Sequence, residues 1–138
     1  MPEGFTVLIT DRNRHVRNFL RRELVAEGYQ VEVAADGRDL LRKVSAGDSP
    51  DLLILDLEIP YSNGLAILKR LQRVNSGLPV IIHGFATEDV IHPTDQCTAA
   101  FVEKMGNTDR LKAAVLEVLR EHYPNRFTTN QREEGGVI

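Results

Sequence analysis

Apolar runs alternate along the chain with segments whose apolar residues recur at helical spacing. Five short runs rich in aliphatic and β-branched residues predict strands at residues 5–10, 29–33, 51–56, 79–83 and 99–103. The run 51–56 is apolar between two acids, which is typical of a strand buried on both faces. The run 29–33 alternates polar and apolar residues, as an edge strand does.

Four amphipathic segments follow these runs, at residues 14–27, 36–47, 64–74 and 107–119. Asp36 is a suitable N-cap for the second segment, and Asn107 or Thr108 for the last. The segment between the fourth and fifth strands differs, because Pro93 stands in its middle and cannot continue a regular helix. We therefore expect a degraded fourth helix that is short, kinked or replaced by a loop.

Five β-α units predict an α/β fold, a doubly wound parallel sheet of five strands with helices on both faces. Right-handed crossovers leave few topologies, and we take the strand order 2-1-3-4-5 from known folds of this kind. The predicted domain covers residues 1–123. The polar, glycine-containing segment 124–138 is predicted to be a disordered tail or linker.

Composition narrows the class of protein. The 138 residues are 42% apolar but only 6% aromatic, which indicates an aliphatic core. A net charge of −3 favours neither nucleic acid nor a membrane as a direct partner. We expect no DNA-binding helix-turn-helix in residues 124–138, whether the chain acts alone through protein contacts or is a receiver excised from a longer chain. The single Cys97 excludes an intrachain disulfide. Since neither a signal peptide nor a bilayer-length apolar run occurs, we expect a cytoplasmic protein.

Three charged residues stand at the carboxyl ends of predicted strands, where open α/β sheets bind ligands. Asp11 follows the first strand, Asp56 ends the third and Lys104 follows the fifth. In the assumed order the first and third strands are neighbours, so we expect the two carboxylates side by side. A cation between them relieves their repulsion, and Lys104 or a divalent metal can supply it. Asp11 is also a candidate N-cap for the first helix.

The run Leu53-Ile-Leu-Asp-Leu-Glu-Ile-Pro60, followed by Gly64, resembles the receiver domains of bacterial response regulators. The spacings that separate Asp11, Asp56 and Lys104 are also similar to those of the family, and the resemblance spans residues 5–123. It implies a flavodoxin-like receiver fold and a signalling module of a two-component phosphorelay. Such a module acts by binding a downstream protein partner. A second copy of the same chain, giving a homodimer, is another partner that the resemblance allows.

The resemblance also implies roles for particular residues. Asp56 would be the phosphoacceptor, taking phosphate from a histidine kinase or a phosphotransfer protein, and Lys104 would pair with the phosphoryl group. Mg²⁺ would be held by Asp11, Asp56 and the backbone carbonyl of Glu58. The only catalysis implied is the domain's own phosphotransfer and dephosphorylation, so the chain is not expected to be an enzyme in any other sense.

Several positions depart from the family pattern. Phe101 stands at the aromatic switch position, but Gly84, at the other switch position, lacks the Ser or Thr hydroxyl that usually bonds the phosphoryl group. Met105 replaces the usual proline after the lysine. Arg12 stands where receivers carry a second acid that ligates Mg²⁺ directly, and a guanidinium has no lone pair to offer.

Arg12 suggests an alternative function. Its permanent charge suits carboxylate binding, so we hypothesise that it occupies the metal's place beside Asp11, Asp56 and Glu58. The pocket would then be neutral without Mg²⁺ and would phosphorylate poorly or not at all. The chain would serve as a pseudo-receiver, a phosphorylation-independent interaction module that has a weakened metal site or no cofactor.

Other classes of protein fit less well. A phosphohydrolase of the haloacid dehalogenase type needs an Asp-x-Asp pair after the first strand, whereas Asp11 is followed by Arg12 and Asn13. A flavodoxin needs a phosphate-cradling loop rich in Ser, Thr or Gly, which residues 11–15 are not. His83, His92 and Cys97 match no zinc spacing.

Overall fold

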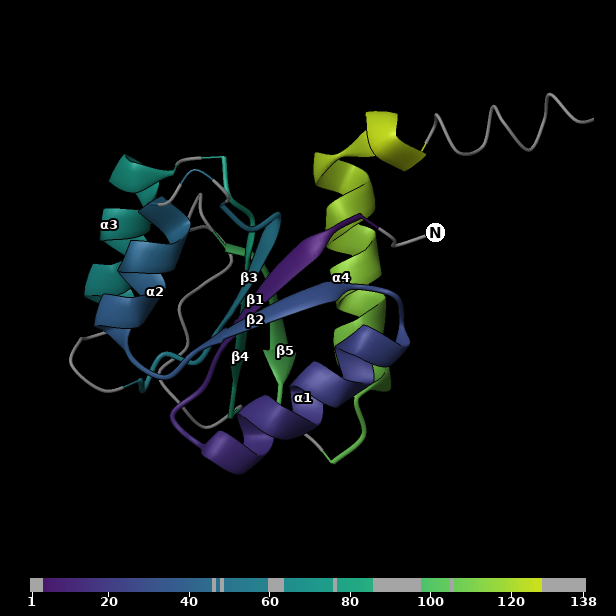
Figure 1. Ribbon diagram of the computed structural model, residues 1–138, viewed down its shortest axis with the longest axis horizontal. Coiled ribbons are helices and arrows are strands. Elements are labelled where there is room, and N and C mark those ends of the chain that lie inside the picture. The colour runs from purple at the N-terminus through teal and green to yellow at the C-terminus, as the bar shows by residue number, and fades with distance from the viewer. Residues whose placement is uncertain are drawn as a thin grey trace, which may run out of the picture.

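The structure is a computed structural model that describes residues 4–45, 47, 49–59, 64–75, 77–85, 98–104 and 106–127. Strands and helices alternate along this part of the chain (Figure 1). Their bounds are β1 (Thr6–Thr10), α1 (Arg14–Ala26), β2 (Gln30–Ala34), α2 (Gly37–Ser45), β3 (Leu52–Leu55), α3 (Gly64–Val74), β4 (Val80–Gly84), β5 (Thr98–Glu103) and α4 (Asp109–His122).

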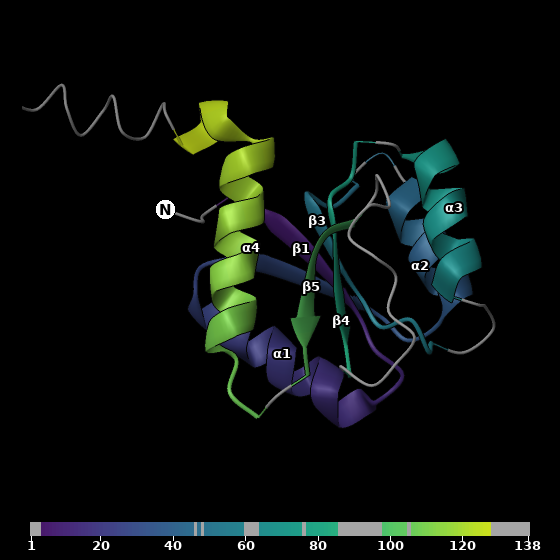
Figure 2. The ribbon, with the colours of Figure 1, turned by 180° about the vertical axis from the view of Figure 1, so that it is seen from behind.

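All five strands run parallel in one sheet, in the order β2-β1-β3-β4-β5. Helices α1 and α4 lie on one face of the sheet, and α2 and α3 lie on the other (Figures 1 and 2). The predicted fold class and strand order are therefore confirmed. Among the described helices, none combines the length and the apolar character that crossing a bilayer requires.

The alternation of side chains along the central strands divides the core into two layers. In β1, Val7 and Ile9 pack with α1 and α4, while Leu8 packs with α2 and α3. Every residue of β3 and β4 is buried, as expected of strands covered on both faces. In β2 the exposed Gln30 and Glu32 alternate with less exposed residues, which confirms the predicted edge strand.

The crossover between β4 and β5 contains the predicted degraded helix and Pro93. Residues 86–97 lie outside the described part of the chain, so this prediction stays untested. The helix labelled α4 is the last one, predicted at 107–119 and observed at Asp109–His122. Strand β5 pairs with β4 through an irregular step between Val80 and Ile81, and then in regular register to Gly84.

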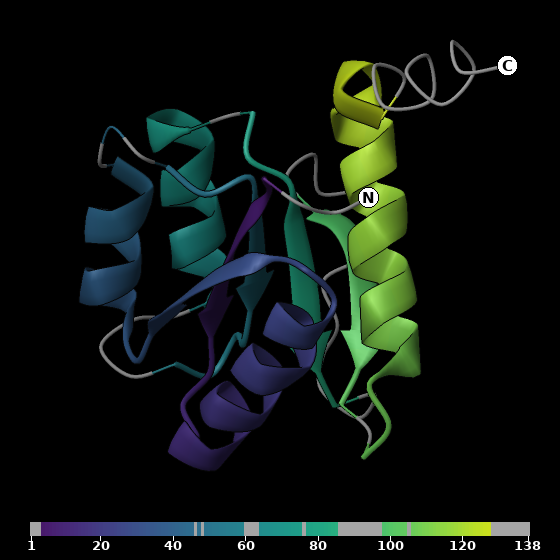
Figure 3. The same ribbon diagram turned by 45° about the vertical axis from the view of Figure 1, so that its right-hand side comes forward.

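The packed part of the chain extends past the predicted domain boundary at residue 123. Phe127 is buried and stacks on Phe5 with ring centroids 5.3 Å apart. Arg126 lies 3.7 Å above the Phe5 ring and pairs with Asp51 at 3.0 Å, and the Tyr123 hydroxyl donates to the Asp51 carbonyl. These contacts join the start of β1 to the end of α4 (Figure 3). A tail beginning at residue 124 is therefore wrong for 124–127, while 128–138 lie outside the described residues.

Candidate functional site

The candidate site lies at the carboxyl ends of β1, β3 and β5. Asp11 follows β1 and Asp56 follows β3, which pairs directly with β1 through Val7 and Leu52. Lys104 follows β5, and its N–H donates to the Gly84 carbonyl at 2.7 Å. Strand pairing thus brings the three charged residues to one edge of the sheet, as the sequence predicts.

The Lys104 ammonium lies between the two buried carboxylates. Its Nζ is 3.0 Å from Asp11 Oδ2 and 3.4 Å from Asp56 Oδ2, while the Asp11 and Asp56 side chains are 1% and 2% exposed. Asp11 Oδ2 accepts no hydrogen bond within the described residues, so the charge of Lys104 is its main compensation. Burying two like charges costs free energy unless a cation lies close to them, and the Lys104 ammonium is one such cation.

Arg12 supplies a second cation over Asp56. Its Nε lies 3.8 Å from Asp56 Oδ2, and its Nη1 forms an ion pair with the Glu58 carboxylate. Its backbone N–H donates to the same Asp56 Oδ2 at 3.1 Å. The Arg12 and Glu58 side chains are 39% and 46% exposed, so their pair forms the outer layer of the site and Asp56 the inner one.

Backbone groups fix both carboxylates. Asp56 Oδ1 accepts the Glu58 N–H at 3.0 Å, and Asp11 Oδ1 accepts the Asn13 N–H at 2.8 Å. Asn13, not Asp11, caps α1, because the Asn13 side chain accepts from the backbone N–H groups of residues 15 and 16. The expectation that Asp11 caps α1 is therefore corrected: its side chain turns into the pocket toward Lys104.

The donor set can be compared with what Mg²⁺ requires. Mg²⁺ prefers an octahedron of oxygen ligands, including carboxylates and waters. Here a guanidinium stands over Asp56 and pairs with Glu58, and an ammonium bridges Asp11 and Asp56. Within the described part of the chain, no three acids, histidines or cysteines converge as a metal-binding group. In this arrangement the residues do not fit a receiver-type Mg²⁺ site.

The two predicted switch positions lie on the neighbouring strands β4 and β5. Gly84 ends β4 and has no side chain to offer a phosphoryl group, although its carbonyl anchors Lys104. Phe101 is partly buried and packs against the core layer under α2 and α3. Met105 lies outside the described residues, as does Pro60.

His83 is a further residue of this region, and its place directly before Gly84 suggests from the sequence that it points into the altered pocket. It is 6% exposed, and burial, with a smaller contribution from the charge of Lys104, lowers its pKa from 6.5 to about 4. The carboxylates of Asp11 and Asp56 oppose this shift in pKa. The alternation of β4 could have indicated its direction, because His83 shares the α1 and α4 side of the sheet with Ile81 of the core.

Comparisons with known proteins agree with the fold. The response regulator receiver domain model matches residues 7–116, so the chain belongs to that family. Response regulator MprA of Mycolicibacterium vanbaalenii is 40% identical over 76 residues, which are 55% of this chain and only 32% of MprA. The chain is thus a receiver domain related to two-component response regulators.

Solved structures give the same result. Response regulator TrrA of Thermotoga maritima, in complex with Mg²⁺-BeF, is 28% identical with a TM-score of 0.75, covering 83% of this chain and 99% of TrrA. TrrA in complex with histidine kinase ThkA is 29% identical with a TM-score of 0.71, covering 83% of this chain and 98% of TrrA.

Proposed function

We propose that this receiver domain is a pseudo-receiver, an interaction module held in one charge state by its own residues rather than switched by phosphate. The observation that carries the proposal is the position of Arg12. Its guanidinium and its backbone N–H both face Asp56 Oδ2, and the guanidinium also binds Glu58.

Charge balance supports this function. The two buried acids, Asp11 and Asp56, face two cations, Lys104 and Arg12, while the third acid, Glu58, lies in the exposed outer layer where water screens its charge. A divalent metal ion such as Mg²⁺ would have to displace the Arg12 guanidinium, which is itself paired with Glu58. Arg12 thereby does the electrostatic work that a metal ion does in a phosphorylated receiver.

Accessibility supports it as well. A nucleophilic carboxylate must present a free oxygen to the incoming phosphoryl group. In Asp56, Oδ1 accepts the Glu58 N–H, and Oδ2 accepts the Arg12 N–H and faces Lys104. With a side chain that is only 2% exposed, Asp56 offers little surface to an incoming phosphoryl group.

Partners of the module follow from its family. TrrA was solved in complex with a histidine kinase, and we propose that this chain likewise binds a histidine kinase, a phosphotransfer protein or a downstream protein in the cytoplasm. Its output is a protein contact rather than catalysis, and a homodimer is one form of that contact. No direct role in binding nucleic acid or membrane is proposed.

A phosphoacceptor receiver is the second candidate function, with Mg²⁺ as its cofactor. It is favoured by the retained pairing of Asp56 with Lys104, whose Nζ lies 3.4 Å from Asp56 Oδ2. For this function Arg12 would have to swing away from Asp56, and its 39% exposed side chain has room to do so.

Intact mass after incubation with acetyl phosphate, with and without Mg²⁺, separates the two functions. The unchanged protein, Arg12→Asp and Arg12→Asp/Asp56→Asn are compared. We expect no adduct on the unchanged protein and a Mg²⁺-dependent phosphate adduct on Arg12→Asp that Asp56→Asn removes. A Mg²⁺-dependent adduct on the unchanged protein that is lost in Asp56→Asn would instead establish the phosphoacceptor.

A further inference from the structure

The outward face of α3 carries three cations and no acid. Lys69, Arg70 and Arg73 are all exposed, and their spacing of three and four residues places them on one side of the helix. These three residues are called the α3 stripe. Ala66 is exposed on the same side, and Val74, which is 48% exposed, follows the last cation. Helix α2 lies beside α3 on the same face of the sheet (Figures 2 and 3).

The fold gives the α3 stripe no counter-charge. No Asp or Glu occurs in the sequence between Glu58 and Glu88, although acids outnumber basic residues in the chain as a whole. The one acid of α2, Asp39, already pairs with Arg42 and Lys43. Among the ion pairs of the described residues, none includes a member of the stripe. Since like charges three or four positions apart on a helix repel, the stripe lowers the stability of α3.

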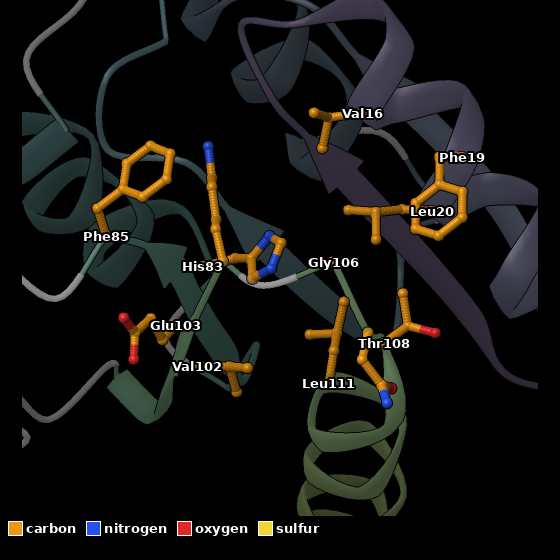
Figure 4. A pocket seen from close by; sticks show the side chains of 12 residues that line it. Val16, Phe19, Leu20, His83, Phe85, Val102, Glu103, Gly106, Thr108 and Leu111 are labelled. Carbon is orange, nitrogen blue, oxygen red and sulfur yellow. The ribbon is translucent and has the colours of Figure 1, made fainter.

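The arginines near α1 differ, because the fold uses them. Arg17 donates to the Asp11 carbonyl, and Arg12, just before the helix, binds the acidic pocket. Helix α1 also borders a cavity of about 390 Å³ that contains His83 and is closed on its other side by α4 (Figure 4). The α3 stripe lies on the opposite face of the sheet, away from this cavity and from α1 (Figure 1). It is therefore a separate charged surface.

We propose that the α3 stripe is a docking surface for an acidic segment of a partner protein, whose carboxylates pair with Lys69, Arg70 and Arg73. Arginine matches the geometry of a carboxylate, which it can bind through two hydrogen bonds. Carboxylates placed between the three cations also relieve their mutual repulsion. The surface does not depend on the pseudo-receiver function, because neither Arg12 nor Asp56 belongs to it.

Other polyanions fit the stripe less well. Proteins that bind single-stranded nucleic acid stack its bases on aromatic side chains, and neither α2 nor α3 contains an aromatic residue. Adsorption to an anionic membrane typically takes clusters of about four to eight Lys and Arg residues, more than the stripe contains. An acidic peptide requires neither feature.

Titration of the full chain, labelled with ¹⁵N, with hexaglutamate at low salt tests the proposal. We expect saturable amide shifts centred on α3, with a dissociation constant of about 1 mM. Binding should weaken severalfold when the salt concentration rises from about 20 mM to about 200 mM, because salt screens exposed ion pairs. Hexaglutamine, which has the same length and no side-chain charge, should not bind.

Paired neutralisations locate the surface. Lys69→Gln/Arg73→Gln removes two cations of the stripe and should weaken hexaglutamate binding by about threefold or more. The variant should keep its melting temperature, since the two cations repel each other. Arg21→Gln/Arg22→Gln is the matched control, because both side chains are exposed on α1 and the same net charge is removed. It should change the dissociation constant by less than about twofold.

Three outcomes would overturn the proposal. The first is no saturable shift of α3 residues with hexaglutamate, and the second is an equal loss of binding in the two paired variants. The third is tighter binding of hexauridylate or of phosphatidylserine vesicles than of hexaglutamate through the same residues, which would assign the stripe to nucleic acid or membrane. If Lys69→Gln/Arg73→Gln unfolds, which its amide spectrum would show, Arg70→Gln supplies the comparison with the control.

Discussion

At the scale of single residues, the acidic pocket depends on Lys104. Its side chain is 12% exposed and touches two carboxylates that are buried almost completely. Removal of one member of a buried ion pair is strongly destabilising, because the opposite charge remains buried without compensation. Asp56 keeps Arg12 as a second partner, whereas Asp11 Oδ2 loses its charge partner.

We therefore predict that Lys104→Met lowers the free energy of unfolding by about 3 kcal/mol in urea denaturation. Adding Asp11→Asn to this variant should recover part of the loss, since it removes the carboxylate left without a partner. If the double variant is no more stable than Lys104→Met, the buried charge of Asp11 is not the cause of the loss.

His83 makes stability depend on pH. Its pKa falls from 6.5 to about 4 on folding, so the unfolded chain takes up a proton on this residue before the folded chain does. The contribution of His83 to the free energy of unfolding is therefore unchanged above pH 6.5. It declines as the pH falls from 6.5 toward 4, and below pH 4 the titration of His83 causes no further loss. The loss from His83 alone amounts to at most about 3 kcal/mol.

Urea denaturation at pH 7.5 and pH 4.5 measures this loss in the parent and in His83→Phe, which cannot titrate at this position. We expect the variant to lose less stability between the two pH values than the parent. Equal losses in the two proteins would show that the His83 imidazole is as easily protonated in the folded chain as in the unfolded chain.

At the scale of elements, the first turn of α1 supports the site. Asn13 caps the helix, its N–H holds Asp11 Oδ1, and the Arg17 side chain donates to the Asp11 carbonyl at 2.6 Å. The cap therefore sets the direction of the short loop from which Asp11 and Arg12 both project.

Replacing the cap should cost stability. We predict that Asn13→Ala lowers the free energy of unfolding by about 1 kcal/mol, the usual loss for an N-cap. Asn18→Ala is the matched control on the exposed face of the same helix, where alanine is the better helix former and no loss is expected. Chemical denaturation measures both, and equal changes in the two variants would mean that the Asn13 cap is not stabilising.

Sequence patterns predict elements better than they predict caps. The cap of α2 is confirmed, because Asp36 Oδ1 accepts the Asp39 N–H at 2.9 Å. At α1, Asp11 and Asn13 are both good cap residues, and the choice depends on Lys104, which is distant in sequence and draws Asp11 into the pocket. At α4, Thr108 is the N-cap but its hydroxyl bonds Glu23 of α1 instead of the helix backbone.

At the scale of the whole molecule, the two ends of the described chain pack against each other. Phe127 is 8% exposed and belongs to the core layer of α1 and α4, and Arg126 joins Asp51 and the Gly4 carbonyl. A single aromatic residue in an otherwise polar segment gives no periodic pattern, which is why the sequence places the domain boundary too early.

We predict that Phe127→Ala lowers the free energy of unfolding by about 3 kcal/mol, as expected for a buried phenylalanine. Glu121→Ala, at an exposed position of α4, should change it little. Thermal unfolding followed by circular dichroism measures both. Similar melting temperatures for Phe127→Ala and the parent would contradict the packing of residues 124–127 on β1.

The part of the site that the strand order determines was predictable from the sequence. The ends of neighbouring parallel strands must meet, so Asp11, Asp56 and Lys104 follow from the strand order. The sequence also indicates that Arg12 is out of place in a receiver. The partners of its guanidinium, and the cavity around His83, depend on side-chain packing between distant segments and emerge only from the three-dimensional structure.

The central claim is that Arg12 takes the place of Mg²⁺ over Asp56, and a calorimetric titration with Mg²⁺ tests it most directly. We predict no saturable binding to the parent at millimolar Mg²⁺. Arg12→Asp should bind, and should lose that binding when Asp56→Asn is added. Tight Mg²⁺ binding to the parent that disappears in Asp56→Asn would contradict the claim, because the metal would then occupy the pocket in spite of Arg12.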